Sequence, residues 1–188
     1  MTSDEVLVER TLSGDLSAFE TLVERHRDVV YRVARRIVGD DEADDVAQDA
    51  FLRAFHRLSL FRGESPFRSW LLRIAHNAAL NALTRRRVAP LDEADSDEPD
   101  HVGAGVERTP AEHLEVSERR RRLAVKLREI GPPHRTVLVL RDIEGLSYEE
   151  IAEVMETPVG TVKGRLHRAR RELIEILRRN TYEWELPE

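Results

Sequence analysis

Residues 146–173, LSYEEIAEVMETPVGTVKGRLHRARREL, contain two short helical patterns joined by a turn. Ser147 and Glu150 have the S-x-x-E spacing of a capping box, which predicts that a helix begins here. A turn follows this helix, and we expect Thr157 to cap a second helix that Pro158 opens. Two short helices joined in this way, the second of them strongly basic, make the stretch a candidate helix-turn-helix.

The second of these helices is basic on the sides that face away from its apolar stripe. The stripe consists of Val162, Leu166, Ala169, Leu173 and Leu177. The other sides hold Gly160, Thr161, Lys163, Gly164, Arg165, His167, Arg168, Arg170 and Arg171. Each glycine costs about 1 kcal/mol of helix stability relative to alanine. A solvated charged face does not explain two glycines, whereas a partner that approaches the backbone closely does, and DNA in its major groove is such a partner.

The composition of the chain is that of a soluble, globular protein. Of its 188 residues 40% are hydrophobic and 35% are charged, and there is no cysteine to form a disulfide or a zinc–thiolate site. No apolar run approaches the roughly 20 residues that cross a bilayer. The opening MTSDEVLVER lacks the basic and apolar regions of a signal peptide. We expect a cytoplasmic protein with no membrane insertion.

The negative charge is concentrated in one segment. Residues 88–118 contain ten acidic residues and one arginine, a net charge of -9. Residues 1–87 balance at 14 basic and 14 acidic, and residues 119–188 carry 15 basic and 12 acidic, which together give the total of -6. A segment so rich in Asp, Glu, Gly and Pro has the composition of a flexible linker, so we expect two modules on a tether. The linker is either a plain solvated spacer or a weak clasp for the basic carboxyl-terminal module.

Two helices with long apolar stripes are predicted in the amino-terminal module. In residues 17–38 the stripe is Phe19, Leu22, Val23, Val30, Val33 and Ile37, and Gly39 follows as a stop. In residues 40–58 the stripe is Ala43, Val46, Ala47, Ala50, Phe51, Ala54, Phe55 and Leu58. On the opposite side of this second helix Leu52 lies among Asp41, Asp45, Gln48 and His56. This leucine is either an ordinary exposed residue or the apolar anchor of a protein-binding site. The acids DDEADD lack the turn glycine of a calcium loop.

A third helix is expected over residues 66–87, with Ser65 as its cap and Pro66 as its first residue. Its apolar face consists of Phe67, Leu71, Ile74, Ala75, Ala78 and Ala82. The opposite face holds Trp70, Arg73, Asn77, Asn81 and Thr84, and the helix ends in Arg85, Arg86 and Arg87. This polar stripe offers hydrogen bonds to base edges and a stacking plane for a base. The alternative places Trp70 in the core and leaves the asparagines solvated.

Three longer stretches form a specific combination. They are AFETLVERHRDVVYRVARRIVGDDEADDVAQDAFLRAF, FRGESPFRSWLLRIAHNAALNALTRRR and LSYEEIAEVMETPVGTVKGRLHRARREL. Together they resemble bacterial RNA polymerase sigma factors of the extracytoplasmic function (ECF) group of the sigma-70 family. The resemblance covers nearly the whole chain except the linker and the last few residues. Two positions depart from the usual pattern: Glu156 stands where the turn commonly has glycine, and Asn81 stands where an acid is more usual.

The resemblance implies an all-α fold with two small helical domains. Residues 1–87 would form the sigma region 2 bundle, residues 119–188 the region 4 helix-turn-helix, and residues 88–118 the flexible acidic linker. It implies that the acidic helix binds core RNA polymerase at the clamp coiled coil of the largest subunit. The residues expected there are Asp45, Gln48, Asp49, Leu52 and Arg53. An anti-sigma factor is a further expected partner.

Promoter DNA is the other implied partner. The FRGESPF loop and the helix after it would recognise and open the minus-ten element, with a base extruded from the stack. The helix from Pro158 would bind the minus-thirty-five element as duplex. The expected DNA-binding residues are Arg62, Arg68, Trp70, Arg73, Asn77, Asn81, Arg85 and Arg86, followed by Ser147, Thr161, Lys163, Arg165, His167, Arg168 and Arg171.

On this interpretation the chain is not an enzyme, because it melts DNA by binding energy and base capture. No catalytic, cofactor-binding or metal-binding residue is expected, since the sequence has no nucleophile–base signature, P-loop or H-E-x-x-H motif. The main alternative is a stand-alone helix-turn-helix regulator, which would bind an operator without polymerase, often as a symmetric dimer. The two dissimilar DNA-facing halves argue against that alternative.

Overall fold

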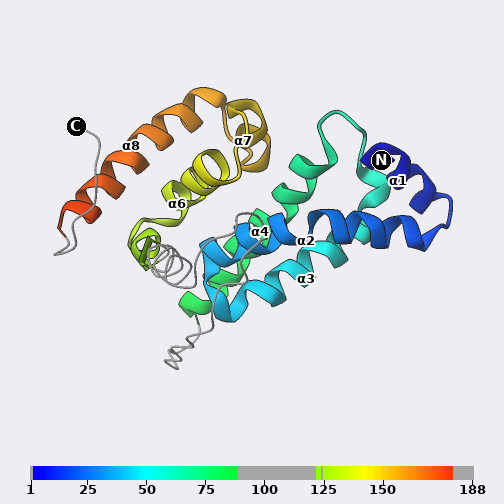
Figure 1. Ribbon diagram of the computed structural model, residues 1–188, viewed down its shortest axis with the longest axis horizontal. Coiled ribbons are helices and arrows are strands. Elements are labelled where there is room, and N and C mark those ends of the chain that lie inside the picture. Colours follow the sequence, from blue (N-terminus) through cyan, green and yellow to red (C-terminus); the bar gives the residue numbers. More distant parts are fainter. Residues whose placement is uncertain (1, 89–121, 124, 180–188) are drawn as a thin grey trace, which may run out of the picture.

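The computed structural model describes residues 2–88, 122–123 and 125–179, so the acidic linker and the clasp hypothesis lie almost wholly outside the described residues. Every regular element in this part of the chain is helical. The α-helices are α1 (Asp4–Leu12), α2 (Leu16–Val38), α3 (Asp40–His56), α4 (Phe67–Val88), α6 (Pro132–Leu138), α7 (Tyr148–Val154) and α8 (Val159–Arg178). Helices α1 to α4 lie in one bundle, and α6 to α8 form a second group beside it (Figure 1). The predicted all-α fold with two helical parts is confirmed.

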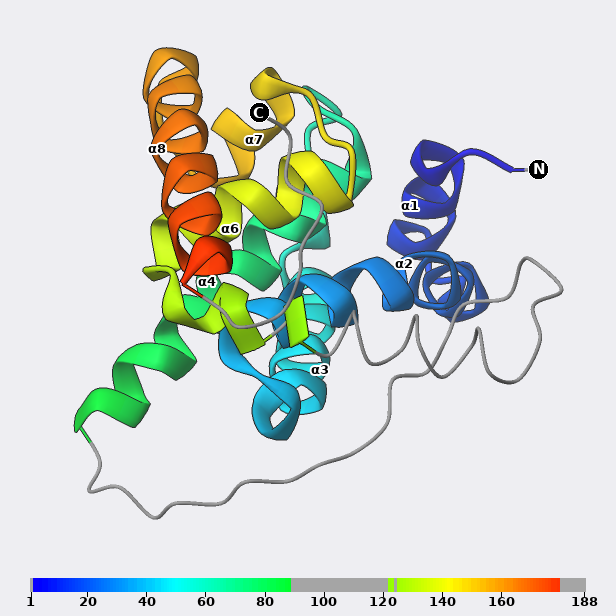
Figure 2. The ribbon, with the colours of Figure 1, turned by 60° about the vertical axis from the view of Figure 1, so that its left-hand side comes forward.

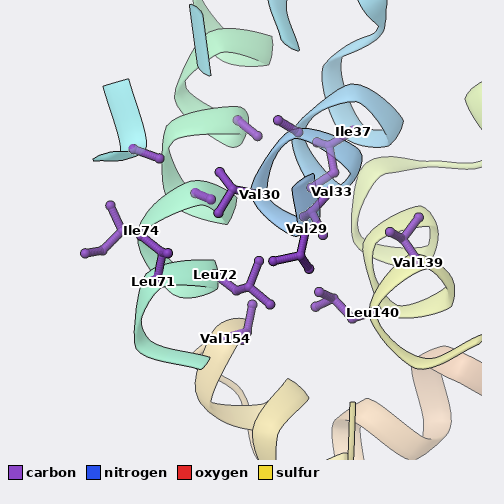
Figure 3. Packing of buried hydrophobic residues seen from close by; sticks show 14 of the residues in the cluster. Val29, Val30, Val33, Ile37, Leu71, Leu72, Ile74, Val139, Leu140 and Val154 are labelled. Carbon is purple, nitrogen blue, oxygen red and sulfur yellow. The ribbon is translucent and has the colours of Figure 1, made fainter. Parts of the chain in front are cut away.

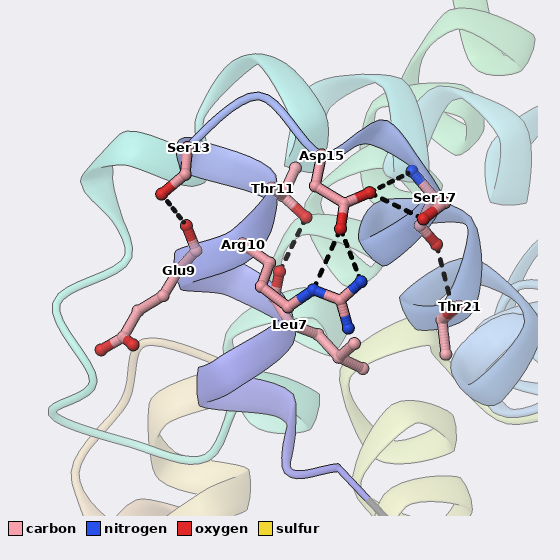
Figure 4. Close-up of polar contacts among 8 residues, drawn as sticks. All are labelled: Leu7, Glu9, Arg10, Thr11, Ser13, Asp15, Ser17 and Thr21. Atoms are coloured by element: carbon pink, nitrogen blue, oxygen red, sulfur yellow. Dashed lines mark hydrogen bonds and ion pairs between the residues drawn. The ribbon is translucent and has the colours of Figure 1, made fainter.

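Helix α1, which the sequence patterns did not predict, is tied to α2 at both of its ends. At the corner between the two helices (Figure 4), Asp15 accepts hydrogen bonds from the backbone N–H of Ser17 at 3.1 Å and from its hydroxyl at 2.7 Å. The same carboxylate pairs with Arg10 at 2.6 Å. The Ser17 bond first, and then Arg10, hold the pKa of Asp15 below its ordinary value. At the start of α1, Asp4 lies 2.8 Å from the ring Nε2 of His26.

The apolar stripes predicted for α2, α3 and α4 form the core of the bundle. The buried positions include Leu22, Val30, Val33 and Ile37 of α2, Ala43, Val46, Ala47, Ala50 and Ala54 of α3, and Phe67, Leu71, Ile74, Ala75, Ala78 and Ala82 of α4. Gly39 has a φ of 104°, which ends α2 and lets α3 begin at the next residue. Phe55 is a correction, because its ring is exposed and meets the ring of Phe19 edge-on instead of entering the core.

The helix-turn-helix forms through the local contacts that its sequence predicts. The capping box is confirmed, since Ser147 Oγ accepts from the N–H of Glu150 at 3.1 Å and the Glu150 carboxylate accepts from the N–H of Ser147 at 2.7 Å. In the turn, Glu156 has a φ of 48°, a left-handed conformation that favours glycine. The chain therefore keeps the usual backbone of such a turn without the usual residue.

The start of α8 differs from the prediction by one residue. Pro158 occupies the N-cap position, and its carbonyl accepts from the N–H groups of Thr161 at 2.9 Å and Val162 at 3.1 Å. The helix therefore begins at Val159. The predicted cap at Thr157 is wrong, because Pro158 occupies the N-cap position and provides no side-chain capping bond.

The two helical parts pack directly against each other. Helix α6 contacts α2 and helix α7 contacts α4, and Figure 2 shows the second group lying alongside the bundle. Buried side chains form one cluster across this contact, where Val29 and Leu72 of the bundle approach Leu140 and Val154 (Figure 3). We call this packing the closed arrangement. The sequence patterns indicate two modules on a tether and give no sign of it.

A buried arginine also joins the two parts. Arg135 donates to the carbonyl of Ile37 at 2.7 Å, near the end of α2, where helix carbonyls lack partners within the helix. Its other N–H groups donate to the carbonyls of Arg128 and Ile130. Burial lowers the pKa of Arg135. Beside it Arg128 pairs with Asp40 of α3 at 2.8 Å.

Candidate polymerase and promoter surfaces

The outer face of α3 presents one large apolar side chain among charged groups. Leu52 is 55% exposed, on the side of the helix away from the buried stripe, as predicted. Asp45 and Gln48 are exposed on the same helix, and Asp49 pairs with Arg53 one turn further on at 2.8 Å. The hydrogen bond to Asp49 raises the pKa of Arg53. A rigid helix with an exposed leucine ringed by charges suits a protein partner that has an apolar groove and complementary charges.

Helix α4 keeps one polar stripe open while its other sides are covered. The open stripe consists of Arg73, Asn77, Asn81, Arg85 and Arg86, of which Arg73 is half-buried. Side-chain amides and guanidinium groups in a row can pair with base edges and phosphates. The bundle core covers a second side, and α7 covers a third, where the hydroxyl of Ser69 lies 3.4 Å from the carboxylate of Glu150.

Trp70 does not lie with this stripe, contrary to the prediction. The residue is only 8% exposed, and its ring packs against Phe61 and Phe67 at centroid distances of 5.4 and 5.6 Å. Phe61 comes from the loop between α3 and α4 and covers the indole, which the helical periodicity of α4 alone does not reveal. The core placement of Trp70 therefore holds in the closed arrangement, and its part in DNA binding stays a prediction.

Helix α8 leaves its outer face open. Its buried stripe includes Val162, Leu166, Ala169 and Leu177, as predicted, whereas Leu173 is half-buried. The exposed polar residues of this face include Lys163, His167, Arg168 and Arg171, with Thr161 and Arg165 half-buried beside them. A Cβ built on Gly160 would meet nothing within 4 Å, and one on Gly164 would meet only the end of the Arg168 side chain at 3.8 Å. Packing among the described residues therefore does not require either glycine.

Some polar side chains near α8 are already engaged. Ser147 takes part in its capping box, and Lys163 lies 5.3 Å from the ring centroid of Tyr148. Arg170 donates to Asp142 through Nε at 3.1 Å and through Nη2, and the bond to Asp142 raises its pKa. This fork links α8 to the short helical turn η2 (Val139–Ile143). Arg170 thus braces the helix-turn-helix, which its sequence position alone does not show.

The two arginines predicted to bind DNA around the α3–α4 loop have different surroundings. Arg62 is exposed, whereas Arg68 points to the second helical part and donates to the backbone carbonyl of Glu144 at 3.2 Å. The carboxylate of Glu144 lies 3.6 Å from Arg68 and also accepts both arms of the Arg32 guanidinium, at 3.0 and 2.9 Å. Arg32 and Glu144 are 112 positions apart, so no local pattern could have identified this cluster.

The buried histidine of α4 is not among the residues that the sequence patterns indicate. His76 is 5% exposed, and its Nδ1 has no hydrogen-bond partner among the described residues. Burial lowers its pKa to about 4, while Glu156 acts to raise it and Arg165 acts to lower it. Both charged groups belong to the helix-turn-helix. The side chain is therefore neutral because the second helical part shields it from water.

Two other classes of site do not occur in the described ranges. No group of three or more histidine, aspartate and glutamate side chains gathers there in a way that could hold a metal ion. None of the described helices is long and apolar enough to cross a membrane.

Comparisons with known proteins identify both helical parts. The Sigma-70 region 2 family model matches residues 22–88, and the Sigma-70 region 4 model matches residues 120–173. The ECF RNA polymerase sigma-E factor of Haemophilus influenzae is 40% identical over 178 residues, which cover 92% of this chain and 94% of that protein.

Solved structures agree with this assignment. The structure of CnrH in complex with the cytosolic domain of CnrY has a TM-score of 0.71 at 31% identity, and the match covers 96% of this chain and 100% of that chain. The sigma factor RpoE of Bartonella quintana, in complex with the anti-sigma factor NepR, shares the fold with a TM-score of 0.67 at 23% identity, over 85% of this chain and 96% of that chain.

The region 2 match covers α2 to α4 of the bundle, and the region 4 match includes the helix-turn-helix. A relative of 40% identity spans both. The chain therefore belongs to the ECF sigma factors of the sigma-70 family and serves promoter-specific transcription initiation by RNA polymerase.

Proposed function

We propose that three surfaces of the described chain have separate roles in the function of a sigma factor. The outer face of α3 binds core RNA polymerase, the open stripe of α4 and the loop before it recognise and open the minus-ten element, and the outer face of α8 binds the minus-thirty-five element. The functional units are residues 1–87 and 119–188, with residues 88–118 as the linker.

The single observation that carries this proposal is the pair of unexplained glycines on α8. Gly164 weakens the interior of the helix, and the described residues leave room for a side chain at both Gly160 and Gly164. They lie among the exposed cations of the same helix. A duplex that approaches the backbone closely accounts for both features, because phosphates attract the cations and a bare backbone lets the groove come near.

Polymerase binding is assigned to Leu52 and its charged neighbours on α3. An exposed leucine on a rigid helix can enter an apolar pocket and act as a binding hot spot. Asp45, Gln48, Asp49 and Arg53 would fix its orientation on the clamp coiled coil of the largest polymerase subunit. This face lies away from the bundle core, so the fold does not have to change for α3 to bind.

Promoter opening is assigned to α4 and involves no covalent chemistry by this chain. Arg73, Asn77 and Asn81 lie in one open row, where they can hold unpaired bases of one strand. Binding an extruded base offsets the free energy of unstacking, which is a few kcal/mol. Arg62 of the loop and the arginines at the end of α4 would contact the phosphates on either side.

The closed arrangement has to open when both promoter elements are bound. Elements centred about 25 base pairs apart are separated by about 85 Å at 3.4 Å per base pair, whereas α4 and α7 touch in the closed arrangement. A linker of the length of residues 88–118 can span about 100 Å at about 3.3 Å per residue. The chain is therefore long enough for its two parts to separate on the promoter.

We also assign an anti-sigma factor to this chain as a partner, and the cytoplasm as its location. The structural relative RpoE was solved with the anti-sigma factor NepR. A protein that binds both helical parts at once would hold the closed arrangement and keep α4 and α8 from separating. The cytoplasm is where core polymerase and promoter DNA are found together.

Run-off transcription with purified core polymerase on a library of random promoter fragments tests the proposed function. We expect transcripts only when the protein is added, and the active fragments should share two elements with a fixed spacing. Binding to a palindromic site as a dimer, with no transcripts from any fragment, would instead establish the stand-alone regulator.

A further inference from the structure

One carboxylate of the second helical part is buried between two arginines of the bundle. The side chain of Glu144 is only 3% exposed. Arg32 of α2 donates to both of its oxygens, from Nε to Oε1 at 3.0 Å and from Nη2 to Oε2 at 2.9 Å. Arg68 of α4 adds a third contact, with Nη2 at 3.6 Å from Oε2. The three side chains form the Arg32–Arg68–Glu144 cluster.

The chemistry of this cluster is that of an oxyanion site. A guanidinium group presents two parallel N–H donors, which match a carboxylate and a phosphate equally well. A phosphodiester carries the same single negative charge as a carboxylate, so it can take the place of Glu144 between the two guanidinium groups. The hydrogen bond to Glu144 raises the pKa of Arg32.

The position of the cluster connects it with promoter binding. Arg68 lies in the first turn of α4, directly after the loop that we assign to the minus-ten element. Arg32 lies on α2, outside every surface assigned above, yet it reaches the same anion as Arg68. Side chains from two helices of the bundle are thus preset around one oxyanion, and the anion itself comes from the part of the chain that must move away.

We propose that Arg32 and Arg68 together form a binding site for a backbone phosphate of the promoter strand, and that Glu144 occupies this site in the closed arrangement. The proposal rests on the proposed function of α4. Glu144 and the DNA phosphate compete for the same two guanidinium groups. The closed chain therefore binds the minus-ten strand weakly, and separation of the two parts on polymerase frees the site.

Fluorescence anisotropy with the full-length chain and a labelled single-stranded oligonucleotide of the minus-ten sequence tests this proposal over a range of salt concentrations. Glu144→Gln should bind the oligonucleotide several-fold more tightly than the unchanged protein. Adding Arg32→Gln to Glu144→Gln should remove most of this gain. It should also reduce the slope of log affinity against log salt by about 0.7, the value for one phosphate contact on a single strand.

Two matched variants control for the change of charge. Glu153→Gln removes an exposed acid from α7, and Arg27→Gln removes an exposed arginine from α2, the helix that carries Arg32. In the Glu144→Gln background, Arg27→Gln should leave both affinity and salt slope unchanged. Circular dichroism of each variant checks that the helices remain folded.

If the Arg32–Glu144 ion pair is purely structural, removal of Arg32 should not weaken oligonucleotide binding. If Arg32 only holds the closed arrangement, its removal loosens the contact, and oligonucleotide binding stays equal or becomes tighter in the Glu144→Gln background. That result, or unchanged binding by Glu144→Gln itself, would overturn the proposal. Run-off transcription with the same variants distinguishes failure of the phosphate site from failure of the proposed function. If the wild-type protein initiates transcription normally and either result above is obtained, only the phosphate site is contradicted. If the wild-type protein never initiates transcription, the proposed function is contradicted.

Discussion

Helices α4 and α8 both carry stripes assigned to DNA, but the closed arrangement leaves them in different states. The outer face of α8 is open along its length, with exposed cations around two bare backbone positions. Helix α4 has α7 against one side, and its Arg68 is engaged by Glu144 and its His76 is buried. Contact between the two parts thus restricts the helix to which we assign single-stranded DNA and leaves open the helix to which we assign duplex DNA.

The largest expected effect concerns His76, which lies on the buried side of α4 and not on its open stripe. Because burial lowers its pKa to about 4, the folded chain binds fewer protons there than the unfolded chain, whose histidine has a pKa near 6.5. Neutral His76 therefore makes its full contribution to the free energy of unfolding above about pH 6.5. This contribution is lost at about 1.4 kcal/mol per pH unit as the pH falls toward 4. Between pH 7.5 and 4.5 the total is about 3 kcal/mol.

Urea unfolding of the wild type and of His76→Leu at both pH values measures this contribution. The wild type should lose about 3 kcal/mol more than the variant, since the titration of carboxylates is common to both proteins. The exposed His56→Gln serves as the control and should behave like the wild type. Equal losses in wild type and His76→Leu would show that His76 is not shielded, and the contrast between the two sides of α4 would disappear.

The next effect concerns α3, a surface that the contact between the two parts leaves open. Leu52→Asp should weaken the affinity for core polymerase by about 2 kcal/mol or more, the scale of an interface hot spot, with helicity unchanged. Leu16→Asp is a matched control, because Leu16 is an equally exposed leucine on α2 of the same bundle. If titration with core polymerase gives the same affinity for Leu52→Asp and Leu16→Asp, the outer face of α3 is not the binding surface.

The third effect concerns Gly164 on the open outer face of α8. Gly164→Ala should stabilise the protein by about 1 kcal/mol, since alanine favours the helix and the site has room for a methyl group. The same change should weaken binding to minus-thirty-five duplex several-fold. Glu175→Ala, at an exposed position of α8, should leave duplex binding unchanged. A Gly164→Ala protein that is more stable and binds duplex equally well would mean that DNA does not approach this backbone.

The smallest effect concerns the turn between α7 and α8. Glu156→Gly relieves a left-handed backbone that costs about 1 kcal/mol for a residue with a side chain. The greater freedom of glycine in the unfolded chain offsets part of this gain, so we expect a net stabilisation of about 0.5 kcal/mol in thermal unfolding. Glu153→Gly, within α7, should instead destabilise by about 1 kcal/mol. Destabilisation by both changes would mean that the Glu156 side chain makes a favourable contact in the turn.

Local sequence determined the helices and their faces. The stripes of α2, α3 and α4, the capping box of α7 and the outward position of Leu52 all follow from spacing over one or two turns. The structure confirms them except at Phe55, which is exposed. These features are predictable because helical periodicity and capping depend on residues within about four positions of each other. Helix α1 was not predicted from such local patterns, and its contacts with α2 include the long-range contact between Asp4 and His26.

Only the tertiary structure decided what covers each face. Periodicity places Trp70 opposite the core stripe, but Phe61 from a loop covers its ring. It gives no sign that α7 lies on α4, that His76 is thereby buried, or that Arg32 meets Glu144 across 112 positions. A charged or aromatic side chain suits both water and a complementary partner, so its own sequence neighbourhood cannot distinguish an open site from an occupied one. That distinction depends on contacts between residues far apart in the chain, which only the packing of the two helical parts brings together.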